Sequence, residues 1–317
     1  MSNTAMQSQQ PKFSVAITTK GYQNLINNTL GDPKRAQRFV AAITSAVAVN
    51  PQLQDCDAGS ILAGGLLGES LGLSPSPQLG QYYLVPFKQK AKYDRSGRLI
   101  SPECLKAQFI LGYKGYIQLA IKSGYYKKLN VIEIKEGELV SFDPLNETID
   151  CVLMEDYAAR EKAETIGYYA MFEYLNGFRK AIYWSKEKML THADTYSQAF
   201  SADAYRKLLA GEIPDKDLWK YSSFWYKNFD DMAKKTMLRQ LISHWGIMST
   251  ELQQAFNSDS TMVEMNDAHD FVTTPPEPQS PNMPPVGTDD YAPHAETMPD
   301  SAAPPVSQTE QVNIADL

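Results

Sequence analysis

The stretch IGYYAMFEYLNGFRKAIYW, residues 166–184, decides the fold because it has the pattern of two β-strands joined by a tight turn. Asn176-Gly177 stands between two runs rich in aromatic and β-branched residues. This pair is a strong short-range hairpin signal, since both central residues of a type I′ turn need a positive φ. The sequence therefore predicts an antiparallel hairpin of residues 166–175 and 178–184.

Further strands and helices are expected on both sides of this hairpin. Short apolar runs predict strands, and apolar residues at helical spacing predict helices. The expected strands cover residues 82–87, 105–111 and 131–135, with a Ser96-Gly97 turn between the first two. Helices are expected after Asp32-Pro33, after Asp57, over residues 113–123 up to Gly124, and through most of 185–256. This order predicts an α+β fold with an antiparallel β-sheet and hairpin core flanked by helices.

Four glycines interrupt the helix expected after Asp57, and they either weaken it or permit close packing of its neighbours. They are Gly64, Gly65, Gly68 and Gly72.

The chain divides by composition into three segments: an N-terminal arm that is partly flexible (1–30), a core (31–257) and an acidic C-terminal tail (258–317). Ten of the 19 prolines fall between Pro275 and Pro305, where aromatic and branched residues are sparse. Such a segment buries too little apolar surface to offset the entropy of ordering, so the tail is expected to be disordered. Residues 312–317 mix apolar and acidic side chains, which suits either a short peptide ligand or an inert end.

Charge is distributed unevenly along the chain. Its net charge is −7, but the last basic residue is Arg239, and residues 240–317 hold twelve acidic residues and no basic ones. Residues 1–239 therefore carry 30 basic and 25 acidic residues, a net charge of +5. This asymmetry favours a body that binds a polyanion, although an acidic tail that only aids solubility is the plainer alternative.

Several classes of function find no support in the sequence. There is no long apolar run, no secretory leader and no paired cysteine spacing, which predicts a cytoplasmic protein without a membrane segment. No Gly-x-x-x-x-Gly-Lys-Ser/Thr loop occurs and the four histidines are scattered, so no nucleotide, metal or other cofactor and no catalytic residue is expected. One enzyme alternative remains: Glu133-Ile134-Lys135 with Asp94 resembles the Mg²⁺ site of some nucleases.

Residues 85–130 combine positive charge with aromatic rings. Ten basic residues there face only two acidic ones, and seven Phe and Tyr residues are interleaved. Cations that follow a phosphate backbone, with rings on which bases stack, suit single-stranded nucleic acid. The alternative is that the rings belong to the core and the lysines to a solvated face. The candidate DNA-binding residues in this stretch are Lys88, Lys90, Lys92, Arg98, Lys106, Tyr113, Lys114, Tyr116, Lys127 and Lys128.

A second candidate cluster lies in the helix expected around residues 229–241. Its apolar residues recur at helical spacing, so one face should pack inward. Asp230 and Asp231 each stand four residues before a lysine, Lys234 and Lys235, a spacing that permits ion pairing. Arg239 lies one turn further. An exposed, ion-paired helix without a function in binding is the alternative.

Several separate stretches resemble the RecT family of phage and prophage single-strand annealing recombinases. They are LGLSP (71–75), LGQYYLVPF (79–87), FILGYKGYI (109–117), Trp225 and DMAKKTMLR (231–239). They agree in order and spacing and cover about residues 20–255, so the tail lies outside the resemblance.

The resemblance implies an α+β core, assembly into homo-oligomeric rings or helical filaments, and ATP-independent annealing of complementary DNA strands in a bacterial host. The implied partners are single-stranded DNA and the annealed duplex intermediate, a 5′→3′ exonuclease and the host single-stranded DNA-binding protein. DNA contact is carried over to Lys114, Lys234, Lys235 and Arg239, and Trp225 is a further candidate. A metal-dependent nuclease and a passive single-stranded nucleic-acid-binding scaffold stay open as alternatives.

Overall fold

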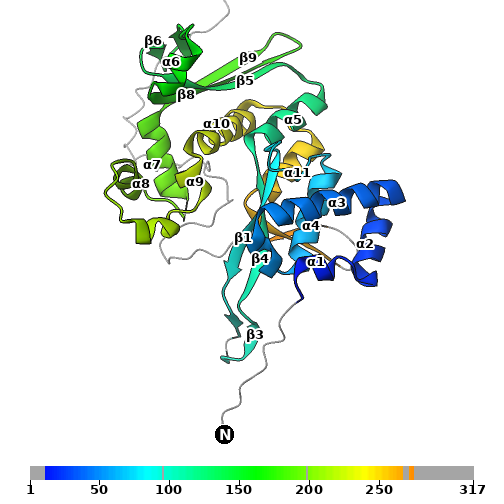
Figure 1. Cartoon of the computed structure of the whole chain (residues 1–317). Coiled ribbons are helices and arrows are strands. Elements are labelled where there is room, and N and C mark those ends of the chain that lie inside the picture. Colours follow the sequence, from blue (N-terminus) through cyan, green and yellow to red (C-terminus); the bar gives the residue numbers. More distant parts are fainter. Residues whose placement is uncertain (1–10, 95, 198, 267–270, 275–317) are drawn as a thin grey trace, which may run out of the picture. The chain divides into compact units, whose positions relative to one another are not determined.

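The computed structural model describes residues 11–94, 96–197, 199–266 and 271–274, and it confirms the α+β fold (Figure 1). The helices are α1 Phe13–Ala16, α2 Lys20–Leu30, α3 Pro33–Val49, α4 Ala58–Ser70, α5 Tyr113–Ser123, α6 Tyr157–Lys162, α7 Lys186–Tyr196, α8 Ala202–Leu209, α9 Phe224–Lys227, α10 Phe229–Trp245 and α11 Thr250–Ser258, with 3-10 turns at Pro51–Asp55 and Asp215–Lys220. The strands are β1 Tyr82–Gln89, β2 Lys92–Tyr93, β3 Leu99–Ser101, β4 Cys104–Leu111, β5 Tyr126–Lys135, β6 Leu139–Asp143, β7 Thr148–Cys151, β8 Thr165–Tyr174, β9 Arg179–Ser185, β10 Thr261–Met265 and β11 Phe271–Thr274.

All the strand pairs in the described residues are antiparallel. One sheet has the order β1-β4-β10-β11, a second has the order β5-β8-β9, and β2-β3 and β6-β7 form small hairpins. No helix among the described residues is both long and apolar enough to cross a membrane.

The hairpin at residues 165–185 is confirmed, but its turn differs from the prediction. Of the two turn residues only Gly177 has a positive φ, of +86°. The Tyr174 N–H donates to the Phe178 carbonyl at 2.8 Å, so the connection contains three residues, Leu175, Asn176 and Gly177. In hairpins with three-residue loops the last position takes the left-handed conformation, which explains why glycine is needed there and asparagine is not strained.

Strands β1 and β4, with their extension β2–β3, form a long two-stranded hairpin that we call the arm, residues 82–111 (Figure 1). The register runs from Tyr82 opposite Leu111 to Gln89 opposite Cys104. The predicted turn lies at its end, where Gly97 has a φ of +79°.

Two aspartates cap the helices α3 and α4, and the glycines of α4 permit close packing against its neighbours. Asp32 and Asp57 each accept a hydrogen bond from a backbone N–H in the first turn of their helices, at 2.9 and 2.8 Å. A Cβ atom on Gly68 would lie 2.4 Å from the Tyr82 ring, so the glycine permits α4 to pack directly on β1. A Cβ on Gly65 would lie 2.9 Å from Ile43 and 3.1 Å from Phe39 of α3, so close helix packing, one of the two predicted roles, is confirmed.

The segment boundaries at both ends need correction. Residues 13–16 and 20–30 form α1 and α2 and contribute Phe13 and Ile26 to the core, so the packed part of the chain begins before residue 31. The chain also stays ordered past residue 258, because β10 pairs with β4, with Met262 opposite Gln108. Burial of Met262 and Val263 against the core explains this order despite the acidic surroundings. Residues 1–10 and the Pro-rich segment 275–317 lie outside the described residues.

Candidate nucleic-acid interface

Two of the resembling stretches meet where the start of α5 touches the two residues before β1. A Cβ on Gly112 would lie 2.1 Å from the Gly80 carbonyl oxygen, and one on Gly115 would lie 2.1 Å from that of Gln81. No side chain fits at either position, so the two glycines permit direct contact between backbones. The Gly112 N–H donates to the Gln81 carbonyl at 2.8 Å and fixes this contact.

The stretch at residues 231–239, which is part of α10, lies at the same place. Phe229, Ala233, Met237 and Leu241 are buried, which confirms the predicted inward face. A cavity of about 30 Å³, room for roughly one water molecule, lies between the three stretches. Its lining includes Gly80, Tyr83, Gly112, Tyr113, Asp231 and Lys235. Segments that are more than a hundred residues apart in the sequence thus lie next to one another in the fold.

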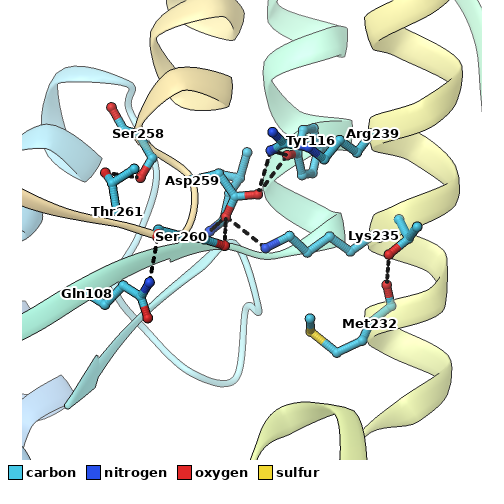
Figure 2. Close-up of polar contacts among 11 residues, drawn as sticks. Gln108, Tyr116, Met232, Lys235, Arg239, Ser258, Asp259, Ser260 and Thr261 are labelled. Carbon is cyan, nitrogen blue, oxygen red and sulfur yellow. Dashed lines mark hydrogen bonds and ion pairs between the residues drawn. The ribbon is translucent and has the colours of Figure 1, made fainter. Parts of the chain in front are cut away.

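Lys235 and Arg239 lie in a buried polar cluster around Asp259, shown in Figure 2. The Lys235 ammonium is 2.8 Å from Asp259 Oδ1, and Arg239 Nη1 is 3.1 Å from Oδ2. The Tyr116 hydroxyl donates to Oδ2 at 3.0 Å, and the Leu111 N–H donates to Oδ1 at 2.9 Å. Four donors therefore converge on one carboxylate, which connects α5, α10 and the start of β10.

The electrostatics of this cluster favour an ionised carboxylate. Burial alone would raise the pKa of Asp259, but Lys235 and Arg239 together hold it below its usual value. Burial and the Asp259 charge raise the pKa of Tyr116, so its hydroxyl stays protonated and is able to donate. A buried charge of this kind is tolerated because it is paired and hydrogen-bonded.

Lys234 points to a different set of partners. Its ammonium is 2.9 Å from Glu133 and 2.9 Å from Asp231, and it lies 4.7 Å from the centre of the Tyr113 ring. The predicted pairing at four-residue spacing is therefore wrong. Lys234 pairs with Asp231 three residues earlier, and Asp230 accepts a hydrogen bond from the Tyr168 hydroxyl at 2.6 Å. Tertiary partners from β5 and β8 are added because α10 packs against these strands: Lys234 gains Glu133 beside its local partner, and Asp230 gains Tyr168.

The other candidate cations differ in how far acidic neighbours neutralise them. Lys90, Arg98 and Lys114 are exposed, and no ion pair of theirs occurs among the described residues. Lys88 pairs with Glu103 at 2.7 Å, Lys106 with Glu264, and Lys127 and Lys128 with Glu173 at 2.6 and 3.5 Å. Lys92 lies in β2, and its side chain is outside the described part.

The candidate aromatic residues are mostly interior. Tyr116 and Trp225 are buried, and Trp225 packs against Phe200 and Phe229 with ring centres 5.7 and 5.3 Å apart. Tyr113 is only half-buried, at the start of α5 beside Lys114. The structure thus brings Tyr113, Lys114 and Lys234 together at the start of α5, and Tyr116, Lys235 and Arg239 together around Asp259.

Asp259 is a residue of this candidate site that the sequence prediction missed. It stands in the acidic segment that composition assigns to the tail, and nothing local marks it as buried. Its only available signal is the strand-like TMVEM run that follows it at residues 261–265.

The residues of the possible nuclease site are engaged elsewhere. Glu133 binds Lys234, the Lys135 ammonium donates to Thr165 Oγ1 at 2.8 Å, and Asp94 accepts from Ser96 in the arm turn. Within the described ranges, no group of three or more His, Cys, Asp or Glu side chains is placed to hold a metal ion.

Comparison with known proteins agrees with the stretches that meet here. The family model described as RecT family matches residues 37–273. The uncharacterized protein YqaK of Bacillus subtilis (strain 168) is 34% identical over 254 residues, covering 80% of this chain and 74% of its own length. Protein RecT of Escherichia coli (strain K12) is 26% identical over 224 residues, covering 71% of each chain. The match includes β10 and most of β11, in agreement with their ordered packing.

Proposed function

Because the chain belongs to the RecT family, which supports a function in DNA recombination or annealing, we propose that it binds single-stranded DNA and anneals complementary strands without nucleotide hydrolysis. The observation that carries the proposal is the convergence of the three stretches at the start of α5. There Lys114 is exposed beside the half-buried Tyr113, and the arm that begins at the same place carries Lys90 and Arg98.

These exposed cations are the proposed phosphate contacts. A cation without an acidic partner releases counterions from DNA when it binds a phosphate, which drives association. Lys88, Lys92, Lys106, Lys127 and Lys128 are proposed as further contacts along the same path. Those that already pair with a glutamate would have to exchange its carboxylate for a phosphate, so each of them contributes less to DNA affinity.

The residues that are buried or paired around α10 are proposed to act mainly by position. Lys235, Arg239 and Tyr116 hold α10 against α5 through Asp259, and Trp225 packs beneath the start of α10. Lys234 packs against the Tyr113 ring with a side chain that is 14% exposed, and Arg239, whose side chain is 36% exposed, is the cation of this helix with the greatest access to DNA.

The mechanism we propose is electrostatic. Repulsion between two DNA backbones opposes annealing, and a cationic track reduces it. Correct pairing then supplies stacking of about 1.4 kcal/mol per base-pair step, so base pairing and not the protein determines specificity. Subunits in a homo-oligomeric ring or helical filament would join their tracks into one surface that also holds the annealed duplex intermediate.

The proposed cellular setting is the cytoplasm of a bacterium that carries the phage or prophage gene. A 5′→3′ exonuclease would supply the single strand, and the host single-stranded DNA-binding protein would hand it over.

The test is annealing of two complementary fluorescent oligonucleotides without ATP, with the protein added to one strand before the other. We expect faster annealing with both strands intact, a loss in Lys114→Ala, and no loss in Lys162→Ala, an exposed lysine on α6. No acceleration would leave a passive binder, and shortened strands would indicate a nuclease.

A further inference from the structure

Residues 136–164, which contain β6, β7 and α6, form a strongly acidic part of the chain that we call the acidic module. They include nine acidic and two basic residues, which gives a net charge of −7. Lys180 and Lys186, from outside the module, pair with two of its carboxylates. Because this charge repels phosphates, the module does not belong to the proposed DNA path. The exposed carboxylates without an ion pair in the described part of the chain are Glu136, Asp150, Glu155, Asp156 and Glu161.

The acidic module also exposes large apolar side chains. Leu145 is 88% exposed, Tyr157 is 81% exposed and Val152 is 69% exposed. Val140 and Leu153 are exposed as well, so these side chains all fall between residues 140 and 157. Apolar side chains gathered on an exposed surface mark interaction sites in soluble proteins. The module therefore combines negative charge with apolar surface.

A buried carboxylate fixes the parts of the module to one another. Glu138 is fully buried, and its carboxylate accepts hydrogen bonds from the backbone N–H of Lys135 at 2.8 Å and of Met154 at 3.1 Å. The same carboxylate pairs with Arg160 of α6, whose Nε is 2.6 Å away. The Val152 N–H donates to the Glu138 carbonyl at 2.8 Å. The module is thus ordered before any partner binds, which reduces the entropic cost of binding.

A hollow beside the module has room for an apolar side chain. It lies between the β6–β7 hairpin and β9, has a volume of about 130 Å³, and includes Phe142, Ile149, Tyr183 and Trp184 in its lining. The Phe142 and Tyr183 ring centres are 5.0 Å apart. An apolar cavity of about 150 Å³ holds a benzene molecule, so this hollow suits one leucine or isoleucine side chain.

The end of the arm has the complementary properties. Residues 82–111 include six basic and two acidic residues, which gives a net charge of +4. Tyr93 and Leu99 are cross-strand partners in β2 and β3, and their side chains and that of Ile100 are exposed. Within the described residues no third strand pairs with β2 or β3. Since a two-stranded hairpin alone is marginally stable in water, contact with a partner would stabilise this end of the arm.

We propose that the acidic module is the docking site for the arm of a second copy of this chain. The inference rests on the homo-oligomer of the proposed function and names the two surfaces that join its copies. The net charges of +4 and −7 attract the surfaces to each other, and the apolar side chains make the contact, with Leu99 or Ile100 in the hollow. Because the charges act over a distance, Lys90 and Arg98 need no carboxylate partner in the contact.

The contact joins two copies and not two parts of one chain. Within the described residues, no ion pair, hydrogen bond or ring contact links residues 88–101 to the module. The pairing of β1 with β4 is continuous from Tyr82 to Gln89, which leaves the arm no hinge by which to fold back. Because the arm and the module are different surfaces, each copy keeps one of them free after it has paired. Such head-to-tail contacts continue into rings or open filaments.

Other occupants of the module fit less well. The module of a second copy would bring two charges of −7 together, which is unfavourable. Single-stranded DNA would meet the same repulsion, because its backbone is negative. A basic segment of a different protein has a suitable charge, and an experiment on the purified chain alone separates it from the arm.

The experiment is sedimentation velocity of the purified full chain without DNA, at low salt and over a range of concentrations. The arm variant carries Leu99→Ser and Ile100→Ser, and the module variant carries Val152→Ser and Tyr157→Ser. All four side chains are exposed, so both variants should fold, and circular dichroism checks this. The unaltered chain should self-associate, and each variant should do so at least about tenfold more weakly, as expected for central interface residues.

A matched control replaces an exposed leucine outside both surfaces. Leu209→Ser, at the end of α8, should associate like the unaltered chain. Equal weakening in this control and in the two surface variants would overturn the proposal, because the loss would then not depend on the arm or the module.

Mixing the two variants gives the sharpest result. The module variant keeps an intact arm and the arm variant keeps an intact module, so the mixture should form one-to-one dimers and no larger species. An unaltered chain that stays monomeric, or variants that associate as strongly as it does, would overturn the proposal. So would a mixture that stays monomeric or forms larger assemblies. Because sedimentation is measured without DNA, failure here and failure of annealing by the unaltered chain are distinguishable.

Discussion

Helix α10 and the arm both carry basic side chains, but these side chains differ in whether an acidic partner neutralises them. In α10, Lys235 is buried and Arg239 is 36% exposed, and the buried carboxylate of Asp259 pairs with both. On the arm, Lys90 and Arg98 extend into solvent, and neither has an ion pair within the described residues. A cation whose charge is already neutralised stabilises the fold, and one without a partner is available to phosphates. The number of basic residues in a motif therefore does not measure its contribution to DNA binding.

The largest expected effect comes from breaking the interior cluster. Asp259→Ala would leave Lys235 buried without a partner, which should lower the free energy of unfolding by about 3–5 kcal/mol. Glu264→Ala, in β10 of the same segment, removes an exposed partner of Lys106 and should cost no more than about 1 kcal/mol. Urea denaturation measures both. Equal losses in the two variants would show that the two kinds of ion pair do not differ as described.

A smaller loss should follow when α5 is forced away from the residues that precede β1. A Cβ on Gly115 would lie 2.1 Å from a backbone oxygen that has no room to move, so Gly115→Ala should cost about 2–3 kcal/mol. Gly21→Ala, in α2 with nothing within 4 Å, should stabilise by up to about 1 kcal/mol. Thermal unfolding of both variants checks the contrast. A harmless Gly115→Ala would mean that α5 and β1 do not need this close contact.

Acid should weaken the interior through His192, which packs between Trp184 and Tyr196. Burial, with the nearby charges of Lys188 and Arg239, lowers its pKa to about 4 from an ordinary value of 6.5. The neutral imidazole is therefore favoured in the folded state, and its stabilisation is lost as the pH falls from about 6.5 towards 4. Between pH 7 and pH 5 the free energy of unfolding should fall by about 1–2 kcal/mol from this group.

His192→Phe provides the control for the acid effect. The variant should lose less stability over the same pH interval, measured by urea denaturation at each pH. An identical acid sensitivity in the two proteins would remove His192 from this explanation.

The elements of the fold could be predicted where the signal is local. Asp32-Pro33 and Gly124 mark helix ends, and the runs at 82–87 and 105–111 pair as the arm. The strands after residue 258 were missed because composition is dominated by the acidic tail around them. Their order comes from contacts with β4 and Asp259, which no local pattern encodes.

The candidate site could be located from the sequence but not sorted into buried and exposed members. Three of the motif stretches meet around Gly112 and Tyr113, so the sequence pointed to a single region of the fold. Whether a lysine faces Asp259 or solvent depends on residues more than twenty positions away. For that reason Lys235 and Lys114 carried the same prediction and lie in different surroundings.

The smallest effect, and the most direct test of this division, is the salt dependence of single-stranded DNA binding. On single strands the logarithm of the binding constant falls with the logarithm of salt concentration, with a slope of about −0.7 per phosphate neutralised. Replacing Lys90, Arg98 and Lys114 together by alanine should make the slope shallower by about 2. Replacing Lys235 and Arg239 by methionine and Asp259 by leucine together removes both ion pairs of the interior cluster without stranding a charge, and should leave the slope unchanged in protein shown to be folded. A slope that becomes shallower in this interior variant and stays the same when Lys90, Arg98 and Lys114 are replaced would contradict the account.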